Sequence, residues 1–307
     1  MLYLSIVSEK LPSIVLIAGG YNKDSKALAS VEIISEGFTN IPMPNLPVKI
    51  NLSPSMFMHN GNILLCGGGV NLQNCLQLEG GIWKQHSSRL NNKRHYASAV
   101  TTNTATFLFG GIDSRDTYEY LAHGFSKWQP GKTKIPGGFY RGYAIAIYHE
   151  KIWLIGGKNT GRRILSFNIV SHSFEELTIK LNVARQYPGC ALIPGTTKMI
   201  ISGGFNVNAE HLTSTEIIDF EDSIVTNAAP MNFKRAGHGI GVLTLNNEDK
   251  VAIFGGFDEK NRFDSVEVYN QKKQKWELTD IKLKEPKSSF GFVTIDSGLI
   301  SQYKPIK

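Results

Sequence analysis

The segment IWLIGG at residues 152–157 decides the fold, because four apolar residues in a row are followed at once by two glycines. A strand with no polar face is buried on both sides. Five other segments have the same form: IVLIAGG at 14–20, ILLCGGG at 63–69, TFLFGG at 106–111, MIISGG at 199–204 and VAIFGG at 251–256. The first glycines of successive segments, at positions 19, 67, 110, 156, 203 and 255, are 48, 43, 46, 47 and 52 residues apart. The chain is therefore built from six repeats of similar length.

Further strand-like segments surround each double glycine. Upstream of most of them is a run of small residues, such as ASAV at 97–100 or GIGVL at 239–243. Downstream is a segment of alternating character, such as VEII at 31–34, whose middle residue is Glu32, Gln77, Glu119, Ser166, Glu216 or Glu267. A large apolar residue follows, and in chain order it is Phe38, Trp83, Trp128, Phe174, Ile224 and Trp276. Each repeat thus predicts four short strands, which we call a, b, c and d in chain order, with the double glycine ending strand b.

These units predict an all-β fold, since no unit can bury its own faces and neighbours must stack. Four-stranded units of this length, repeated radially, are typical of a β-propeller. We predict one six-bladed propeller over residues 1–307, with four antiparallel strands in each blade. The blade cores are expected near 11–40, 50–86, 94–130, 141–177, 185–227 and 235–279, with a closing strand at 289–297.

The repeats resemble those of the kelch family. The matching features are the six double glycines, the Tyr or Glu of strand c, and the spaced Trp83, Trp128 and Trp276, and they cover residues 14–295. In the similar propellers of BTB–kelch adaptor proteins, a C-terminal strand becomes the innermost strand of blade one. The resemblance implies the same closure here, with residues 292–295 in that strand. The alternative is that residues 2–7 supply it.

A basic residue recurs in the segment that enters strand a. It is Arg94, Arg141, Arg185 or Arg235, with Lys287 at the matching place before the last strand and Lys49 or Asn51 in blade two. In the kelch family this segment and the loop between strands b and c form the face used for ligands. The resemblance implies that the arginines ring the mouth of the central channel, where guanidinium groups suit carboxylates. The alternative is that each arginine bonds loop carbonyls of the neighbouring blade and holds the ring together.

Aromatic and histidine residues accompany these basic positions, and arginine with aromatic residues is typical of interface anchors. The candidate partner-binding residues beside the arginines are His95, Tyr96, Tyr140, Tyr143, Tyr187 and His238. Tyr21, Phe205 and Phe257 directly follow double glycines and complete the set. The glutamates of strand c recur from blade to blade, which favours a structural role over an acid–base one.

Local motifs for a zinc site, a phosphate loop or a nucleophile elbow are absent from the sequence, so we predict no catalytic residue, cofactor or metal. A net charge of +7 favours an anionic partner. The lysines between 272 and 287 alternate with acids, which indicates a solvated surface rather than a nucleic-acid site. Neither a signal peptide nor an apolar run of roughly 18 residues is visible, which predicts a cytoplasmic protein that does not contact membranes. For Cys66 and Cys75, two free buried thiols are preferred over a hairpin disulfide.

Taken together, these patterns predict a monomeric interaction module that binds a protein or peptide, with an acidic partner favoured. The kelch resemblance implies the substrate-recognition part of a ubiquitin-ligase adaptor, or a cytoskeletal binder. The alternative is a small-molecule enzyme of the kelch sugar-epimerase type, with its site at the channel mouth.

Overall fold

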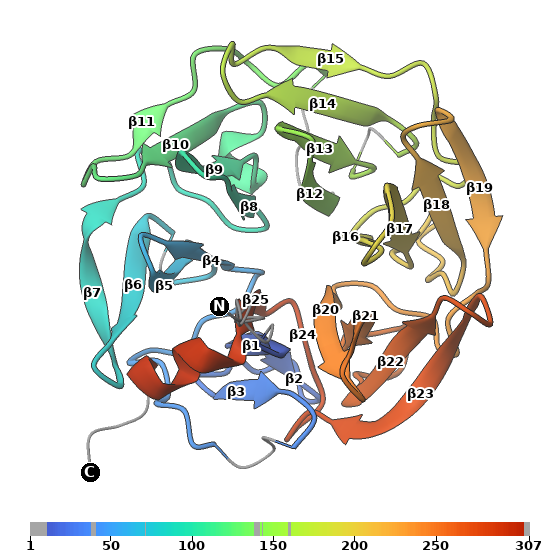
Figure 1. Cartoon of the computed structure of the whole chain (residues 1–307). Helices are drawn as coiled ribbons and strands as arrows, with labels where there is room; N and C mark the ends of the chain where they lie inside the picture. Colours follow the sequence, from blue (N-terminus) through green and yellow to red (C-terminus); the bar gives the residue numbers. More distant parts are fainter. Residues whose placement is uncertain are drawn as a thin grey trace, which may run out of the picture.

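Six antiparallel sheets surround a central axis in the computed structural model of the chain (Figure 1). The structure describes residues 11–37, 41–70, 72–137, 142, 144–158 and 161–303. The prediction of a six-bladed all-β propeller is therefore confirmed. Two short 3-10 helices, η1 (Ile112–Ser114) and η2 (Ser297–Tyr303), complete the described elements. Among the described residues, no helix has the length and apolar character needed to cross a bilayer.

Five blades each contain four consecutive strands, from a on the inside to d on the outside. Blade two consists of β4 (Ser55–His59), β5 (Asn62–Cys66), β6 (Asn74–Glu79) and β7 (Ile82–Arg89). Blade three consists of β8 (Ser98–Thr101), β9 (Ala105–Phe109), β10 (Tyr118–Ala122) and β11 (Gln129–Pro130). Blade four consists of β12 (Ala144–Tyr148), β13 (Lys151–Ile155), β14 (Ile164–Asn168) and β15 (Phe174–Glu176). Blade five consists of β16 (Gly189–Leu192), β17 (Lys198–Ser202), β18 (Thr215–Asp219) and β19 (Ile224–Ala228). Blade six consists of β20 (Gly239–Leu245), β21 (Glu248–Phe254), β22 (Ser265–Asn270) and β23 (Lys275–Lys282).

Blade one joins the two ends of the chain. Its described strands are β25 (Gly291–Asp296), β1 (Ser13–Ala18) and β3 (Val31–Ile34), in that order from the axis outward. β25 pairs antiparallel with β1 from Ser13 opposite Asp296 to Ala18 opposite Gly291. The predicted closure by a C-terminal strand is confirmed, and it leaves β1 with a partner on each side. A small sheet of β2 (Tyr21–Asn22) and β24 (Lys287–Ser288) adds to this contact, while Phe38, expected on strand d, lies outside the described residues.

The hydrophobic core is divided into six clusters, and each cluster lies between two neighbouring blades. One of them joins Phe107 of β9 to Leu154 of β13, and another joins Trp153 of β13 to Met199 of β17. Strand b is buried on both faces because it contributes side chains to both neighbouring clusters. Loss of one blade would therefore expose two clusters, which ties the stability of each blade to its neighbours.

The double glycines allow a neighbouring loop to approach closely. Gly67 has a φ of +72°, and a Cβ there would clash with the carbonyl oxygen of Arg94 from the segment entering blade three. The next glycine, Gly68, donates its N–H to that same oxygen at 3.0 Å. Glycine is required because it tolerates positive φ and has no Cβ to keep the carbonyl away.

The cysteines differ from the sequence-based expectation. Cys66 and Cys75 lie opposite one another on β5 and β6 and form a disulfide, so the preference for two free thiols was wrong. Cys190 is a free, buried thiol, and burial raises its pKa to about 12.

Candidate partner-binding face

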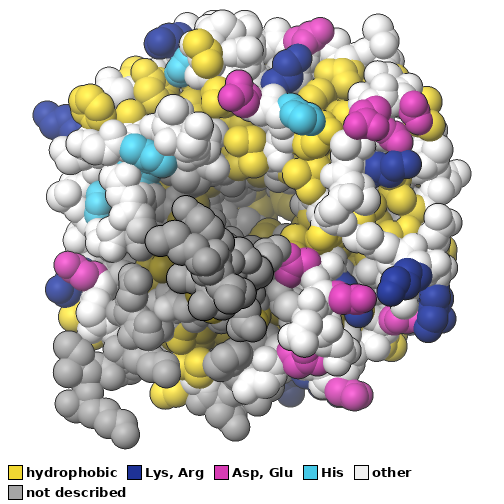
Figure 2. Space-filling view, viewed as in Figure 1, with side chains coloured by type: hydrophobic (Ala, Val, Ile, Leu, Met, Phe, Trp, Pro, Cys, Tyr) yellow, Lys and Arg dark blue, Asp and Glu magenta, His cyan; other side chains and the backbone are white. Residues whose placement is uncertain are grey.

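Two sets of loops share one face of the ring, which we call the mouth face. The segments that enter strand a reach it, and so do the loops that follow the double glycines, because strand a begins where strand b ends. The channel opens on this face into a cavity of about 210 Å³, which we call the mouth pocket. The opposite face, which carries η2, shows both signs of charge scattered around its rim (Figure 2).

The predicted ring of ligand-binding arginines is not formed. Arg94, Arg185 and Arg235 are at most 1% exposed, so none of them reaches a ligand at the mouth. Their guanidinium groups instead turn into their own blades toward the glutamates of strand c. Arg141 lies outside the described residues. The placement at the mouth was wrong for these three arginines.

Arg94 holds blades two and three together. Its backbone carbonyl accepts the Gly68 N–H and its own N–H donates to the Leu72 carbonyl at 2.9 Å, both in blade two. Its side chain reaches blade three, where Nε donates to Glu119 Oε1 at 2.5 Å and Nη1 donates to the Gly110 carbonyl. We call this arrangement the clasp. The alternative prediction had each arginine bonding loop carbonyls of the neighbouring blade. At Arg94 the bonds to the neighbouring blade come from its backbone, whereas its guanidinium bonds its own blade.

The clasp recurs at three further junctions. Arg185 pairs with Glu216 at 2.9 Å, Arg235 with Glu267 at 3.0 Å and Lys287 with Glu32 at 2.6 Å. The other carboxylate oxygen accepts a backbone N–H three residues upstream of the base, from Asn91, Asn182, Asn232 or Lys284. The strand-c glutamates are thus structural, as predicted.

Blade two keeps the backbone part of the clasp without its charges. Ile50 accepts the Gly20 N–H at 2.8 Å and donates to the Leu28 carbonyl at 2.9 Å. Ile50, rather than Lys49 or Asn51, is therefore the residue equivalent to Arg94. The matching strand-c position in this blade is Gln77, which is neutral. This junction therefore lacks both the base and the acid of the clasp, as expected when an unpaired buried charge is costly.

Burial lowers the pKa of the Arg185 and Arg235 guanidinium groups, and the nearby carboxylates of Glu216 and Glu267 oppose that effect. Arginine starts from so high a pKa that both groups stay charged at neutral pH. These ion pairs therefore hold the scaffold and carry no free charge to the mouth face.

Predicted aromatic residues do come together on the mouth face. The ring centroids of Tyr96 and Tyr187 are 5.3 Å apart, and those of Tyr187 and Phe205 are also 5.3 Å apart. Phe257 and Tyr21 continue the line in blades six and one. All five side chains are half-buried, so each keeps part of its surface in solvent.

Two residues that the sequence did not single out complete this line. The His211 ring lies 5.7 Å from that of Phe205 and 5.1 Å from that of Phe257. The Arg262 guanidinium lies 6.0 Å from the Phe257 ring centre and 5.6 Å from that of Tyr21. Each missed residue faces an aromatic across the small hairpin that follows a double glycine, His211 opposite Phe205 and Arg262 opposite Phe257. We call the whole set the aromatic arc: Tyr96, Tyr187, Phe205, His211, Phe257, Arg262 and Tyr21.

The two tyrosines adopt a strained backbone. Tyr96 and Tyr187 stand two residues before strand a, with φ of +57° and +53°. Gly142 and Gly237 occupy the same position in blades four and six. Backbone bonds between blades hold this turn, including Tyr187 N–H to the Gly142 carbonyl at 2.5 Å. A bulky residue in a conformation that suits glycine is typical of functional positions.

The remaining predicted residues divide into three groups. His95 is half-buried, with its ring 5.8 Å from that of Tyr96 and its Nδ1 3.4 Å from Asp113. His238 is buried, its Nε2 is 2.9 Å from Ser202 Oγ, and burial followed by the Arg235 charge lowers its pKa to about 3. It is therefore neutral at physiological pH. Tyr140 and Tyr143 lie outside the described residues.

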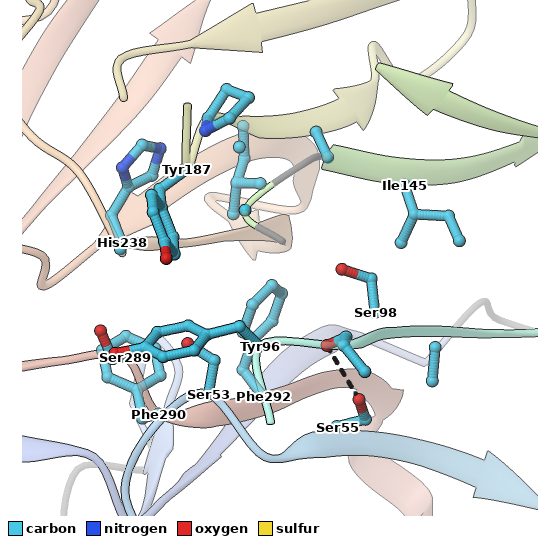
Figure 3. Close-up of a pocket in the computed structure, with 18 of the residues that line it drawn as sticks. Ser53, Ser55, Tyr96, Ser98, Ile145, Tyr187, His238, Ser289, Phe290 and Phe292 are labelled. Carbon is cyan, nitrogen blue, oxygen red and sulfur yellow. Dashed lines mark hydrogen bonds between the residues drawn. The ribbon is translucent and has the colours of Figure 1, made fainter. Parts of the chain in front are cut away.

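The mouth pocket is lined by hydroxyl groups and apolar side chains (Figure 3). Tyr96 and Tyr187 stand at its entrance, and Ile145 projects toward it from β12. Its described lining contains no carboxylate, lysine or arginine. The hydroxyl groups belong to Ser53, Ser55, Ser98, Ser289, Tyr96 and Tyr187, and the aromatic rings of Phe290 and Phe292 form part of the wall.

Exposed lysines form the outer charge of the mouth face. Every one of the six segments that lead into strand a carries at least one, a signal that sequence reasoning passed over. We call this set the lysine rim: Lys49, Lys93, Lys132, Lys134, Lys180, Lys234 and Lys284. Lys134 pairs with Asp116 at 2.7 Å. The acids on the described parts of these segments are Glu36 and Glu285, so these segments are positive. The loops that follow the double glycines add acids to the same face: Asp24, Asp113, Asp116, Glu210, Asp258 and Glu259.

Within the parts of the chain that the structure describes, no three His, Cys, Asp or Glu side chains are arranged to hold a metal ion.

The comparisons with known proteins agree with this architecture. Residues 248–278, which span β21 to part of β23, match the family model described as a kelch motif. A RING finger domain and kelch repeat-containing protein of Dictyostelium discoideum is 23% identical over 229 residues, covering 73% of this chain and 22% of that protein. Spermatocyte protein spe-26 of Caenorhabditis elegans is 21% identical over 225 residues, covering 68% of this chain and 38% of that protein.

The chain thus corresponds to well under half the length of either relative. Kelch propellers generally serve as protein-interaction modules. The kelch motif in blade six, the similarity to a kelch-repeat protein over most of the chain and the ring of six sheets place this chain among the kelch-repeat β-propellers.

Proposed function

We propose that this propeller binds a partner protein on the mouth face, with the aromatic arc as its anchor. The observation that carries this proposal is the arc itself. Half-buried side chains from blades three, five, six and one meet there in continuous contact around the channel mouth. Tyrosine and arginine are enriched among the residues that dominate binding energy at protein interfaces.

The partner presents an acidic segment to this face. The lysine rim surrounds the arc, and only Lys134 forms an ion pair within 4 Å among the residues that the structure describes. Rim charges of one sign speed the encounter with a partner of the opposite sign and select against partners of the same sign. The lysines therefore take the role that the buried arginines cannot fill.

A role as the substrate-recognition part of a ubiquitin-ligase assembly is the finer form of this proposal. One relative combines kelch repeats and a RING finger domain in its name, and the propeller would supply the substrate-binding part of such an assembly. The test is whether a captured partner is ubiquitinated less in cells that carry a chain with an altered aromatic arc.

The sugar-modifying enzyme has less support from the geometry. The described lining of the mouth pocket offers neither a carboxylate nor a guanidinium group to hold an acidic sugar. His238, the histidine in that lining, is neutral, and its Nε2 is already bonded to Ser202.

The interaction is tested with substitutions that suit the backbone. Tyr96→Gly together with Tyr187→Gly places glycine where blades four and six already have it, so we expect the propeller to fold. Capture from native extract followed by mass spectrometry should show a partner lost by at least tenfold relative to the wild type. Phe125→Ala is the matched control, because Phe125 is 69% exposed on the opposite face. If the Tyr96→Gly, Tyr187→Gly chain recovers the same partner as the Phe125→Ala control, the mouth face is not the binding surface.

A further inference from the structure

The mouth pocket is an opening of about 210 Å³ whose described wall carries no charge. Its entrance is formed by hydroxyl groups of Tyr96, Tyr187, Ser53 and Ser289, and its wall includes Phe290 and Phe292 (Figure 3). Such a wall stabilises a side chain with an apolar body, and its hydroxyl groups can satisfy a few polar atoms.

Among the residues that the structure describes, the pocket wall offers no lysine or arginine to a carboxylate inside it. Four described basic residues that precede strand a, Arg94, Arg185, Arg235 and Lys287, are buried and paired with glutamates of strand c. Arg185, for example, donates to Glu216, to the Gly203 carbonyl and to both oxygens of Ser214. The described cation beside the wall is Arg262 of the aromatic arc, whose Nε donates to Ser288 Oγ at 2.9 Å, next to Ser289 of the lining. Burying an ionised group without a partner is strongly unfavourable, so the described wall of the pocket selects against acids.

The lysine rim, which lies around the pocket, favours acidic groups on the partner. Its lysines are exposed on the six segments that surround the pocket. The described mouth face therefore contains two zones of different chemistry: a centre whose described lining is uncharged, and a periphery where exposed lysines on the segments entering strand a alternate with loops that carry acids. A single bound segment can satisfy both zones only if its own residues alternate in the same way.

Resting on the proposed function, we infer that the mouth pocket receives one uncharged, largely apolar side chain of the partner, and that acidic residues flanking it meet the lysine rim. The mouth face would thus bind a short acidic segment of the partner that has an apolar residue at its centre. The arginine ring that the kelch resemblance implied would have read a carboxylate at this place instead.

The test is selection from a random peptide display library against the whole chain. We expect enriched peptides to share an apolar or aromatic position flanked by Asp or Glu. Selection is repeated with Ser98→Leu, which narrows the pocket, and with Ser171→Leu, the same change at an exposed turn on the opposite face. Ser98→Leu should remove the preference at the apolar position and leave the acidic positions enriched, whereas Ser171→Leu should reproduce the wild-type peptides.

Two outcomes overturn the inference. One is a charged residue at the centre of the enriched peptides, and the other is an unchanged apolar preference with Ser98→Leu. The proposed function fails separately, when peptides selected on the wild type bind the Tyr96→Gly, Tyr187→Gly chain equally well. A third readout is the affinity of a single synthetic enriched peptide, which should fall at least tenfold when its apolar residue is replaced by Asp.

Discussion

Arg185 and Glu216 form an ion pair of 2.9 Å that is almost completely shielded from solvent, with side-chain exposures of 0% and 1%. The same residues join two blades, because the Arg185 carbonyl accepts the Gly157 N–H of blade four while its guanidinium bonds blade five. The stability of the ring therefore depends in part on ion pairs and hydrogen bonds that are buried between the blades.

Removing one partner of this pair should be strongly destabilising. We expect Arg185→Ala to lower the free energy of unfolding by about 3–5 kcal/mol, because Glu216 is left as a buried charge without its cation. Denaturant titration followed by tryptophan fluorescence measures the change. The control follows blade two, where Ile50 and Gln77 occupy these positions. The double variant Arg185→Ile, Glu216→Gln should recover at least half of the loss, and a double variant no more stable than Arg185→Ala would contradict this account.

The first glycine of each pair should resist substitution more than other glycines with positive φ. Gly67→Ala meets both a φ of +72° and the carbonyl oxygen of Arg94, whereas Gly80→Ala meets a φ of +56° and nothing within 4 Å. A positive φ costs a residue with a Cβ about 1–2 kcal/mol. We expect Gly80→Ala to cost that amount and Gly67→Ala to cost clearly more, both read from the midpoint of thermal unfolding. Equal effects would show that the close approach contributes nothing.

How much the sequence could predict is clear at the clasp. The double glycines predicted six blades, because period and apolar pattern determine which strands are buried. The closure by the run at 292–295 was implied by the kelch resemblance, since the pattern also left residues 2–7 as an alternative. The direction of the Arg94 side chain was not predictable in the same way, since it depends on a glutamate 25 residues away. One signal was present in five of the six blades: Glu32, Glu119, Glu216 and Glu267 occur in blades with a basic clasp residue, and Gln77 occurs in the blade with Ile50. Blade four does not follow this pairing in sequence, because Ser166 is its strand-c residue while Arg141 was its predicted basic residue.

The aromatic arc was predictable only in part. Tyr21, Phe205 and Phe257 stand at a fixed distance from the double glycines, so the repeat finds them. His211 and Arg262 stand six and five residues later, and their places depend on hairpins of different length. The contacts of these two residues with rings of neighbouring blades depend on the hairpin lengths, so the repeat period alone could not predict them.

The disulfide leaves one free thiol in the folded chain. Protein unfolded without reductant should take up one equivalent of an alkylating reagent, on Cys190, and reduction before unfolding should raise this to three. Peptide mapping by mass spectrometry identifies the labelled residue. Labelling of Cys66 or Cys75 before reduction would show that the bond is not formed.

The lysine rim should act mainly on the association rate. We expect Lys93→Glu with Lys234→Glu to slow association with the captured partner by at least tenfold at low salt, and the difference should shrink as ionic strength rises. Surface plasmon resonance at several salt concentrations measures both effects. Lys127→Glu with Lys272→Glu is the matched control, because these exposed lysines lie on turns of the opposite face. A control pair that slows association equally would assign the effect to net charge alone.

His59 should make the junction of blades two and three sensitive to acid. It is 4% exposed, its Nδ1 is 3.0 Å from Thr106 Oγ1, and its ring lies 5.1 Å from that of His123. Burial, and then the neighbouring His123 and His86, lower the pKa of His59 from 6.5 to about 4. The folded state therefore prefers neutral His59, so this contribution to stability is complete above about pH 6.5 and is lost as the pH falls toward 4.

A shift of this size corresponds to a loss of about 1–3 kcal/mol between pH 7 and pH 4. His59→Asn keeps a group that can bond Thr106 but does not titrate, so the variant should lose less stability than the wild type over this range. His149→Asn, at an exposed turn, should follow the wild-type curve. Free energies of unfolding from denaturant titrations at pH 7, 6, 5 and 4 make the comparison. If His59→Asn follows the wild-type curve as well, the acid sensitivity arises from other groups, and His238, whose pKa is lowered to about 3, is the next histidine to replace.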